Sequence, residues 1–352
     1  MTERTPAGKR RAAAADRRAE LKRKIYGYRA SQCVRAAALL GLPDHLADGP
    51  LTAQELASRA GADAETLARL LRALVGLRLL RRRRDGRFAL TPLGEPLRAG
   101  TPDSLRDDAL HALGPTSWLP WGELVESVRS GAASFPRLYG ESAWEHRARN
   151  AESRALFDAM ARARSRAETA AILARLALPR RGLVVDLGGG RGELLAAILA
   201  RRPELTGALF ELPEVLTGAA TLLRDAGVAS RCRLVAGDLF AEVPAGGDLY
   251  LLKAVLHNWD DAAALRILRN CRKAMSPRAR LVIVESLADV THGEDSELQD
   301  LHMLVMHGGR ERVAAELEAL LREAGLRCSG IRKTAESCCL IESVPARRPW
   351  AP

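Results

Sequence analysis

The stretch LVVDLGGGRGELLAAIL, from Leu183 to Leu199, decides the fold class of this chain. An apolar run ends at Asp186, four glycines follow within the next six residues, and an apolar helical repeat begins after Gly192. This order is typical of a buried strand, a tight turn and a helix. Glycine in such a turn lets the backbone approach a ligand closely, because no Cβ stands in the way. Several classes of nucleotide-like ligand bind at turns of this kind, so the turn alone does not identify the ligand.

Short apolar strands alternate with helical patterns from Gly182 onward. The predicted strands read LVVDL, GALFEL, CRLVAGD, DLYLLKAV and RLVIVESL, followed by an antiparallel-looking pair, LRCSGIRKT and SCCLIES. Near-continuous apolar strands separated by helices indicate a buried parallel sheet with helices on both faces. We therefore predict an α/β fold in which residues 181–346 form a doubly wound, Rossmann-like sheet.

The N-terminal part of the chain predicts a smaller helical domain with a wing. Thr52 is expected to cap a short helix, Gly61 to turn the chain, and residues 64–77 to form a second helix. LRLLRRRRDGRFAL then predicts a two-stranded hairpin around Asp85-Gly86. Helix, turn, helix and wing together give a winged-helix domain over residues 19–104. Residues 1–18, rich in Arg and Ala, are expected to form a disordered basic tail.

The composition is that of a globular protein with two or more domains. Its 352 residues include 47% hydrophobic ones, which is ample for packed cores. The net charge of +11 suits nucleic acid or anionic ligands, but a solvated surface is the more ordinary explanation. The six cysteines form no CxxC pair, so we expect reduced thiols and no metal site. The charged N-terminus and the lack of a membrane-length apolar run predict a cytoplasmic protein without a signal peptide.

Polar residues collect at the carboxyl ends of the predicted strands, which is the edge where such sheets bind ligands. In chain order they are Asp186, Glu211, Asp238, Lys253, His257, Trp259 and Glu285. Asp186 lies just before the glycine turn. A carboxylate at this position repels a phosphate and attracts a cationic ligand. Glu211 has the spacing of an acid that accepts from ribose hydroxyls, although an ordinary acid at a helix start is the alternative. These features favour S-adenosylmethionine (SAM), which carries a sulfonium, an ammonium and no phosphate.

Six blocks of the chain resemble the small-molecule O-methyltransferases. They are VVDLGGGRGELL, FELPEV, AGDLFAEVP, LLKAVLHNWDDAAALRILRNCRKAM, LVIVES and DLHMLVMHGGRER. The family includes plant enzymes of the caffeic-acid type and bacterial enzymes that tailor aromatic polyketides and other antibiotics. The resemblance runs from about residue 20 to residue 345. It implies SAM as methyl donor, S-adenosylhomocysteine as product, and a homodimer formed through the N-terminal domain. We expect no metal, because the methyl donor is already cationic and the sequence has no ligand cluster with metal spacing.

The resemblance also implies roles for individual residues. His257 matches the catalytic base of the family, and Glu285 and Glu311 match the acids that flank and orient it. Glu211 stands where the family usually has Asp, and Asn258 stands where plant members often have Asp. The cofactor-binding positions are Asp186, Gly188, Gly190, Glu211, Leu212, Gly237, Asp238, Leu239, Lys253 and Trp259. A histidine titrates in the range needed to remove a phenolic proton, and a positioned base contributes roughly 10²–10⁴-fold to rate.

Residues 105–180 form a helical, aromatic-rich segment that we expect to contribute the pocket for a small aromatic substrate. Trp118 and Trp121 bracket a proline, which predicts a loop or a bent helix. Aromatic rings and adaptable methionines suit a flat apolar acceptor, although core packing explains any single one equally well. The candidates are Trp118, Trp121, Phe157, Met160, His302, Met303 and Met306. Arg162 and Arg164 could meet a substrate carboxylate, but exposure to solvent is the more ordinary state.

Two other functions remain open from the sequence. The winged helix and the basic stretch Arg81 to Arg84 suit a DNA-binding regulator, although in the resembled family this element forms the dimer. Some family members bind SAM but catalyse hydroxylation or rearrangement, usually after loss of the base. Because His257, Glu285 and Glu311 are all present, we expect methyl transfer, and we expect no nucleic-acid or membrane partner.

Overall fold

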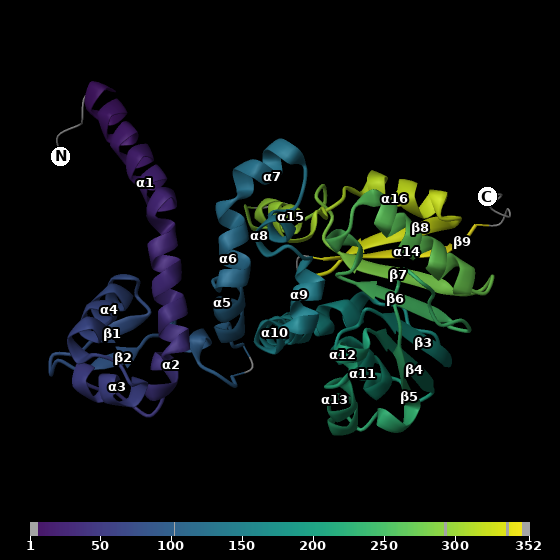
Figure 1. Cartoon of the computed structure of the whole chain (residues 1–352), viewed down its shortest axis with the longest axis horizontal. Helices are drawn as coiled ribbons and strands as arrows, with labels where there is room; N and C mark the ends of the chain where they lie inside the picture. Colours follow the sequence, from purple (N-terminus) through teal and green to yellow (C-terminus); the bar gives the residue numbers. More distant parts are fainter. Residues whose placement is uncertain (1–5, 102, 292–293, 336–337, 347–352) are drawn as a thin grey trace. The chain divides into compact units, whose positions relative to one another are not determined.

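The chain divides near Pro115 into two compact units in a computed structural model that describes residues 6–101, 103–291, 294–335 and 338–346 (Figure 1). The first unit reaches past the predicted boundary at residue 104 because α5, Arg106–Ala112, belongs to it. Just after α5, the carbonyl of Leu113 accepts from the Gln32 side chain at 3.3 Å. None of the helices in these ranges is both long enough and apolar enough to cross a bilayer.

The first unit contains the predicted helix–turn–helix and wing. Its further elements are α2 Leu42–His45, α3 Ala53–Ala60, α4 Ala64–Gly76, β1 Leu80–Arg82, β2 Phe88–Leu90 and the 3-10 helix η1 Glu95–Leu97. Thr52 starts α3 with a capping box, because its hydroxyl accepts from the Glu55 N–H and its own N–H donates to the Glu55 carboxylate. Gly61 ends α3 with φ of 61°, a left-handed conformation that favours glycine. Leu56 and Leu71 are fully buried between the helices.

The N-terminal helix differs from the prediction. Helix α1 spans Pro6–Leu39, so residues 6–18 of the expected disordered tail are helical, while residues 1–5 lie outside the described ranges. Alanine and arginine are strong helix formers, which explains a helix in a segment that lacks an apolar periodicity. Leu21, Ile25 and Tyr28 lie at helical spacing on α1 and are each about half exposed or more.

A seven-stranded sheet forms the centre of the second unit, in the order β5-β4-β3-β6-β7-β9-β8. The strands are β3 Gly182–Leu187, β4 Leu205–Glu211, β5 Cys232–Ala236, β6 Leu249–Lys253, β7 Arg280–Glu285, β8 Leu326–Lys333 and β9 Cys339–Pro345. The first five strands in this order, β5, β4, β3, β6 and β7, pair in parallel with their neighbours, whereas β9 is antiparallel to both β7 and β8. The doubly wound sheet and the final antiparallel pair are thus confirmed. The strand order reverses between β3 and β6, which places the ligand edge at the ends of these strands.

Helices cover both faces of the sheet (Figure 1). Helices α14, Asp261–Ala274, and α16, Ala314–Glu323, pack on one face, where Leu268 and Leu321 are fully buried. Helices α11, Glu193–Arg201, and α13, Ala219–Asp225, pack on the other face together with Ile172. The connections between them include α12 Pro213–Leu216, η2 Ala229–Arg231 and η3 Leu256–Asn258.

The helical segment predicted over residues 105–180 belongs, from residue 116 onward, to the second unit. It comprises α6 Pro115–Gly122, α7 Leu124–Ser130, α8 Ser134–Tyr139, α9 Ala143–Arg149 and α10 Ala151–Arg175, with α15 Glu294–His307 beside α7 and α8. Pro120 lies inside α6, so the stretch predicted as a loop or bent helix is helical. Met306 on α15 is fully buried in a small core with Phe135 and Val305, which is the packing alternative for this substrate candidate.

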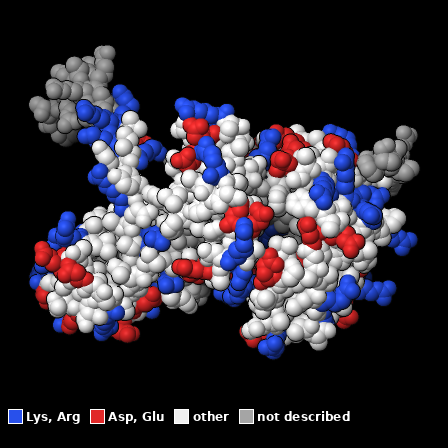
Figure 2. All heavy atoms as spheres, viewed as in Figure 1, with Lys and Arg blue, Asp and Glu red and all other residues white. Residues whose placement is uncertain are grey.

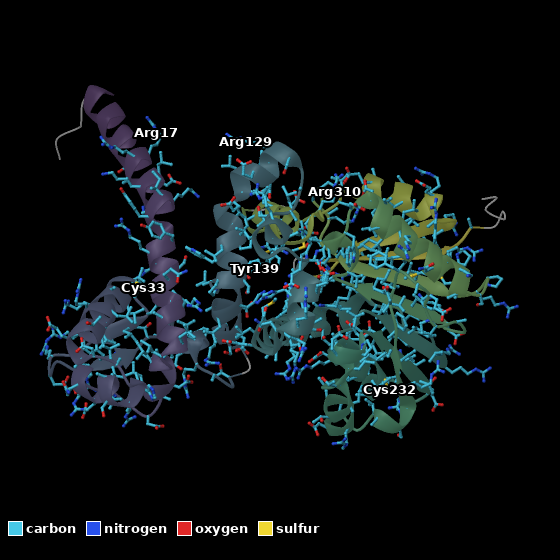
Figure 3. All side chains as sticks on the ribbon, viewed as in Figure 1. Arg17, Cys33, Arg129, Tyr139, Cys232 and Arg310 are labelled. Atoms are coloured by element: carbon cyan, nitrogen blue, oxygen red, sulfur yellow. The ribbon has the colours of Figure 1, made fainter. Side chains whose placement is uncertain are left out.

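The molecule carries charged side chains of both signs and six cysteines. On the face shown in Figure 2, basic and acidic side chains are interspersed over the second unit, while α1 carries mainly basic ones. All six cysteines are free, and the labelled Cys33 on α1 and Cys232 at the start of β5 lie in different units (Figure 3). No group of three or more His, Cys, Asp or Glu side chains within the described ranges is arranged to hold a metal ion.

Candidate active site

The glycine turn after β3 has the backbone geometry of a ligand cradle. Gly188, Gly190 and Gly192 have φ of 68°, 61° and 89°, a region that side chains with a Cβ rarely adopt. Glycine is needed at position 189 for a different reason: a Cβ there would lie only 2.4 Å from Oδ2 of Asp186, so a larger residue would clash. The Asp186 carboxylate therefore lies against the backbone of Gly189, where no side chain intervenes.

Asp186 is a buried carboxylate without a local partner. It is 1% exposed, and neither carboxylate oxygen meets a hydrogen-bond donor among the residues that the structure describes. Burial raises the pKa of Asp186 to about 7, against the lowering effect of the Lys253 charge. A buried, unsatisfied carboxylate is costly unless a cation or a donor pairs with it. This site therefore fits a cationic ligand that arrives over the glycine turn.

Glu211 faces the same turn from the end of β4. Its Oε1 accepts from the Gly190 N–H at 3.1 Å, and its Oε2 accepts from the Leu212 N–H at 2.7 Å. Burial raises the pKa of Glu211 to about 7, although both N–H donors lower it. The extra methylene of glutamate, relative to aspartate, lets this side chain curl back to the turn. Leu212 follows at 37% exposure and extends the same edge.

The end of β5 forms the next part of the edge. The Gly237 N–H donates to the Glu211 carbonyl at 3.0 Å, and Oδ1 of Asp238 accepts from the Phe240 N–H at 2.8 Å. The Leu239 carbonyl accepts from Asn270, which fixes this loop on α14. The structure thus brings the predicted cofactor residues of β3, β4 and β5 together at one edge of the sheet.

Lys253 and Trp259 have partners that the sequence did not indicate. Nζ of Lys253 lies 2.7 Å from Oε2 of Glu168 on α10, and both side chains are largely buried. The Trp259 ring meets the edge of Phe240 at a centroid distance of 4.7 Å and stacks on Trp144 at 6.2 Å. Lys253 is therefore already paired at the edge of the cofactor region, and Trp259 is held between two aromatic rings.

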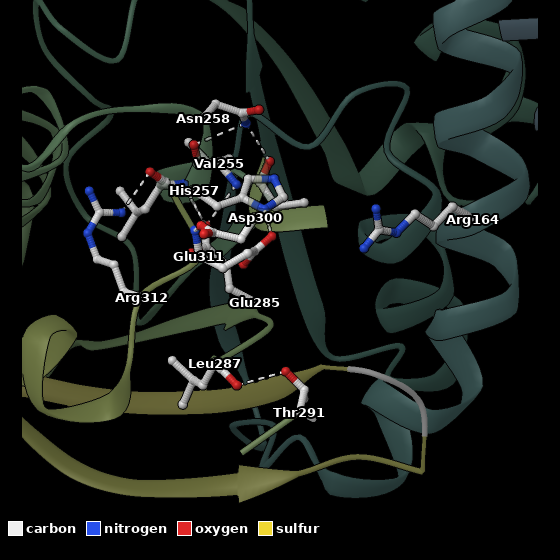
Figure 4. A network of polar contacts seen from close by, with 12 residues as sticks. Arg164, Val255, His257, Asn258, Glu285, Leu287, Thr291, Asp300, Glu311 and Arg312 are labelled. Atoms are coloured by element: carbon white, nitrogen blue, oxygen red, sulfur yellow. Dashed lines mark hydrogen bonds and ion pairs between the residues drawn. The ribbon is translucent and has the colours of Figure 1, made fainter. Parts of the chain in front are cut away.

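The predicted catalytic group is assembled around η3, immediately after β6 (Figure 4). His257 is 6% exposed, and its Nδ1 lies 2.8 Å from Oε1 of Glu311, which is 4% exposed. Among the hydrogen bonds of the described residues, none joins Glu285 to the imidazole that we expected it to orient, although its charge acts on His257. Its Oε1 instead accepts from three backbone N–H groups, those of Val255, Leu256 and His257. Glu311 therefore orients the ring, and Glu285 fixes the backbone that carries it.

Residues 309–312, which follow α15, hold the η3 loop in position through hydrogen bonds. The Arg310 N–H donates to the His257 carbonyl at 2.9 Å, and the Glu311 N–H donates to Asp300 at 2.7 Å. A Cβ on Gly309 would lie 2.1 Å from the His257 carbonyl oxygen, so the GGRER block needs glycine there for close approach. Arg312, 3% exposed, donates to the carbonyls of Leu256 and Trp259 and to Asp261.

The electrostatics of His257 suit a proton acceptor. Burial by itself lowers the pKa of the imidazole, but the Glu311 hydrogen bond and the charges of Glu285 and Glu311 outweigh it and raise the pKa above 6.5. Burial raises the pKa of Glu285, while the nearby His257 and Arg312 lower it. Since Glu311 engages Nδ1, Nε2 is the nitrogen from which His257 can serve a substrate.

The predicted substrate residues differ in burial and in their contacts with other aromatic rings. Trp121 donates from Nε1 to Nδ1 of His302 at 3.0 Å, and Phe157 meets Trp144 edge-on at 5.8 Å. Met303 is buried like Met306, whereas Trp118 and Met160 are partly buried on α6 and α10. Trp144, which the sequence analysis did not select, contacts both Trp259 and His307. Its only sequence signal is its place in the aromatic-rich helical segment.

Comparison with known proteins identifies the family. The sequence profile of the O-methyltransferase domain matches residues 121–327, and that of the O-methyltransferase dimerisation domain matches residues 23–99. The chain is an O-methyltransferase-family protein. The first match covers more than half of the chain, and the second covers the winged helix. The SAM-dependent family, which the six blocks indicated, and the fold, which the alternating strands and helices indicated, are confirmed.

The similarity to individual relatives extends over nearly the whole chain. Phenazine O-methyltransferase from Lysobacter antibioticus is 37% identical over 91% of this chain and 94% of its own. The solved structure of mitomycin 7-O-methyltransferase has a TM-score of 0.91 at 36% identity, over 95% of this chain and 99% of that one. An O-methyltransferase from neocarzinostatin biosynthesis, solved with SAM and 2-hydroxy-5-methyl naphthoic acid, has a TM-score of 0.81 at 36% identity over 90% and 96%.

One relative transfers methyl groups to nitrogen. The 8-amino-8-demethylriboflavin N,N-dimethyltransferase of Streptomyces davaonensis is 38% identical over 87% of this chain and 89% of its own. The chain is therefore a SAM-dependent methyltransferase; of the four relatives named here, three are O-methyltransferases and one methylates nitrogen.

Proposed function

We propose that this protein methylates a hydroxyl group of an aromatic natural-product intermediate, phenolic or polyketide-derived, and that His257 is the general base. The observation that carries the proposal is the buried pair of His257 Nδ1 and Glu311 Oε1 at 2.8 Å. This hydrogen bond fixes the imidazole so that Nε2 receives the hydroxyl proton, while the carboxylate stabilises the imidazolium that forms. A neutral aromatic amine has a free lone pair and needs no such base, so the pair favours an oxygen acceptor.

The cofactor site follows from the same edge of the sheet. When bound, SAM supplies a methyl group on a cationic sulfur. Asp186 would hold the cationic methionine end over the glycine turn, because its buried carboxylate has no donor within the described ranges. Glu211 would accept from the ribose hydroxyls in exchange for its contact with the Gly190 N–H, and Asp238, Leu239 and Trp259 would border the adenine. Holding donor and acceptor in line can contribute roughly 7–11 kcal/mol to lowering the barrier.

The acceptor is aromatic in the relatives whose names state it, including a naphthoic acid and a phenazine. In this chain Trp121, Phe157, Trp144 and Met303 supply rings and a thioether near η3 and α15 that suit a flat acceptor. We further infer a homodimer formed through residues 23–99, since this range matches the dimerisation domain and α1 exposes Ile25 and Tyr28 within it.

The proposal is tested by transfer of labelled methyl from SAM to matched aromatic alcohols and amines. Wild type and His257→Gln are compared with each acceptor. The proposal expects oxygen acceptors to be methylated by wild type and at least ~100-fold more slowly by the variant. Transfer to amines alone, with His257→Gln unaffected, would assign the N-methylating activity instead.

A further inference from the structure

Arg147 on α9 is a buried cation without a dedicated partner. It is 7% exposed, and its Nη1 meets no hydrogen-bond acceptor among the residues that the structure describes. Its guanidinium carbon lies 3.9 Å from the centroid of Phe157 and 4.8 Å from that of Trp144. Asp158 is the carboxylate whose charge acts on it, but Asp158 is engaged by Arg191 at 2.9 Å. A guanidinium in this position gains most from an additional anion.

Further positive groups act on the same region. Burial, and then the charges of Arg147, His257 and Arg164, lower the pKa of His302 to about 4, so His302 is neutral at physiological pH. Because His302 Nδ1 accepts from Trp121, its proton lies on Nε2 and adds another donor. Arg164 reaches from α10 toward His257 and Glu311 (Figure 4). Its side chain is 42% exposed and is paired with Glu168 at 2.9 Å. Among the described residues, Arg147 is therefore a buried cation of this region for which no ion pair with a carboxylate is found.

The rings beside Arg147 connect it to the catalytic loop. Trp144, on whose face Arg147 lies, stacks on Trp259 with an interplanar angle of 25° and on His307 with 19°. Trp259 follows His257 by two residues in the loop fixed by Arg312. The charges of Arg147 and His257 both act on His302, so an acceptor whose hydroxyl lies at the histidine would bring a second ring substituent into the region of the guanidinium.

We propose that Arg147 binds a carboxylate of the acceptor, so that the substrate is a hydroxyaryl acid held as its anion. This inference rests on the proposed function and specifies its substrate class. A guanidinium presents parallel N–H donors that match a carboxylate in a bidentate pair, and a low dielectric strengthens the pair. A site built around such a pair rejects an uncharged analogue, because the buried cation then loses its partner. If Arg147 only supported the rings of Trp144 and Phe157, the enzyme would have the same kcat/KM for an acid and for its uncharged analogue.

The first test needs no variant. The wild-type enzyme is assayed with hydroxynaphthoic and hydroxybenzoic acids and with the primary amide of each. We expect kcat/KM for the preferred acid to exceed that for its amide by about 100-fold or more, mainly through KM. Equal kcat/KM values for acid and amide would overturn the inference and leave the proposed function intact.

Variants then locate the effect. Arg147→Gln should remove the preference for the acid while retaining turnover of the amide, and Arg147→Lys should restore part of it. Arg149→Gln is the matched control on the same helix, since its side chain is 72% exposed, and it should keep the wild-type preference. An Arg147→Gln enzyme that folds and still prefers the acid as strongly as wild type would contradict the inference.

A binding measurement separates the two proposals. If no acceptor is methylated, the proposed function fails, and calorimetry with S-adenosylhomocysteine-loaded protein decides the inference alone. Binding of the acid at least ~10-fold tighter than the amide by wild type, and not by Arg147→Gln, supports it. Equal binding of acid and amide by wild type refutes it.

Discussion

Glu311→Gln should shift the pH dependence of turnover to lower pH. The substitution keeps the size of the side chain and an oxygen that can accept from His257 Nδ1, but it removes the buried negative charge 2.8 Å from the ring. That charge and its hydrogen bond raise the pKa of His257, against the effect of burial. The base works in its neutral form, so kcat/KM rises with pH through this pKa, and a lower pKa moves the rising limb to lower pH.

The size of the shift follows from the strength of the lost interaction. A hydrogen bond to a charged group contributes about 1.5–3 kcal/mol. At about 1.36 kcal/mol per pKa unit, its loss corresponds to a shift of about 1–2 units. On the plateau, the weaker and less firmly oriented base should reduce kcat by about 10- to 100-fold, since a positioned base contributes ~10²–10⁴-fold in total.

The assay is kcat/KM from about pH 5 to pH 9, the range over which a histidine titrates. Two acceptors whose phenol pKa values differ are used, so that ionisation of the substrate is separated from ionisation of the enzyme. Glu323→Gln is the control, because Glu323 is 59% exposed and pairs with Arg269 at the surface. A rising limb that stays in place in Glu311→Gln, with both acceptors, would refute the assignment of Glu311 as the partner of the base.

Three further predictions concern the cofactor edge and the loop. SAM affinity should increase as pH rises through about 7, the raised pKa of Asp186, because the ionised carboxylate binds the cation, and calorimetry of Asp186→Asn should show a weaker and flatter profile. Gly189→Ala places a Cβ 2.4 Å from the Asp186 carboxylate, so SAM should bind at least ~10-fold more weakly, and unchanged binding would argue against the cradle. Arg312→Met removes the guanidinium donors to the carbonyls of Leu256 and Trp259, of which Leu256 keeps the Trp259 N–H as a donor, and should lower the free energy of unfolding in urea by about 2–5 kcal/mol, whereas exposed Arg269→Met should change it by less than ~0.5 kcal/mol.

The edge of the sheet was predictable because its signals are local. Asp186, the glycines and Glu211 stand at strand ends that the apolar runs mark directly, and the parallel topology brings these ends together. His257 and Glu311 were paired through the resemblance, and the structure shows that their side chains meet. For the strand ends, the order of residues along the chain is sufficient to predict the arrangement, whereas the pair of His257 and Glu311 needed the resemblance.

The partners of these residues were not predictable in the same way. Glu168 reaches Lys253 from α10, and Asp300 accepts from the Glu311 N–H, through packing that no local pattern encodes. Glu285 was expected to flank and orient the imidazole, and its charge does act on His257, but its hydrogen bonds to the backbone of η3 were not predicted. The burial of Arg147 depends on how α9 packs near Phe157, so its sequence neighbourhood gives no sign of it.

The most direct test of the central claim is single-turnover transfer of labelled methyl from SAM to a hydroxyaryl acid by wild type and by His257→Gln. SAM binding to both proteins is measured by calorimetry in parallel. The account predicts equal SAM affinity and a loss of at least ~100-fold in the transfer rate for the variant. Transfer by His257→Gln at the wild-type rate, with SAM bound equally well, would contradict the assignment of His257 as the base.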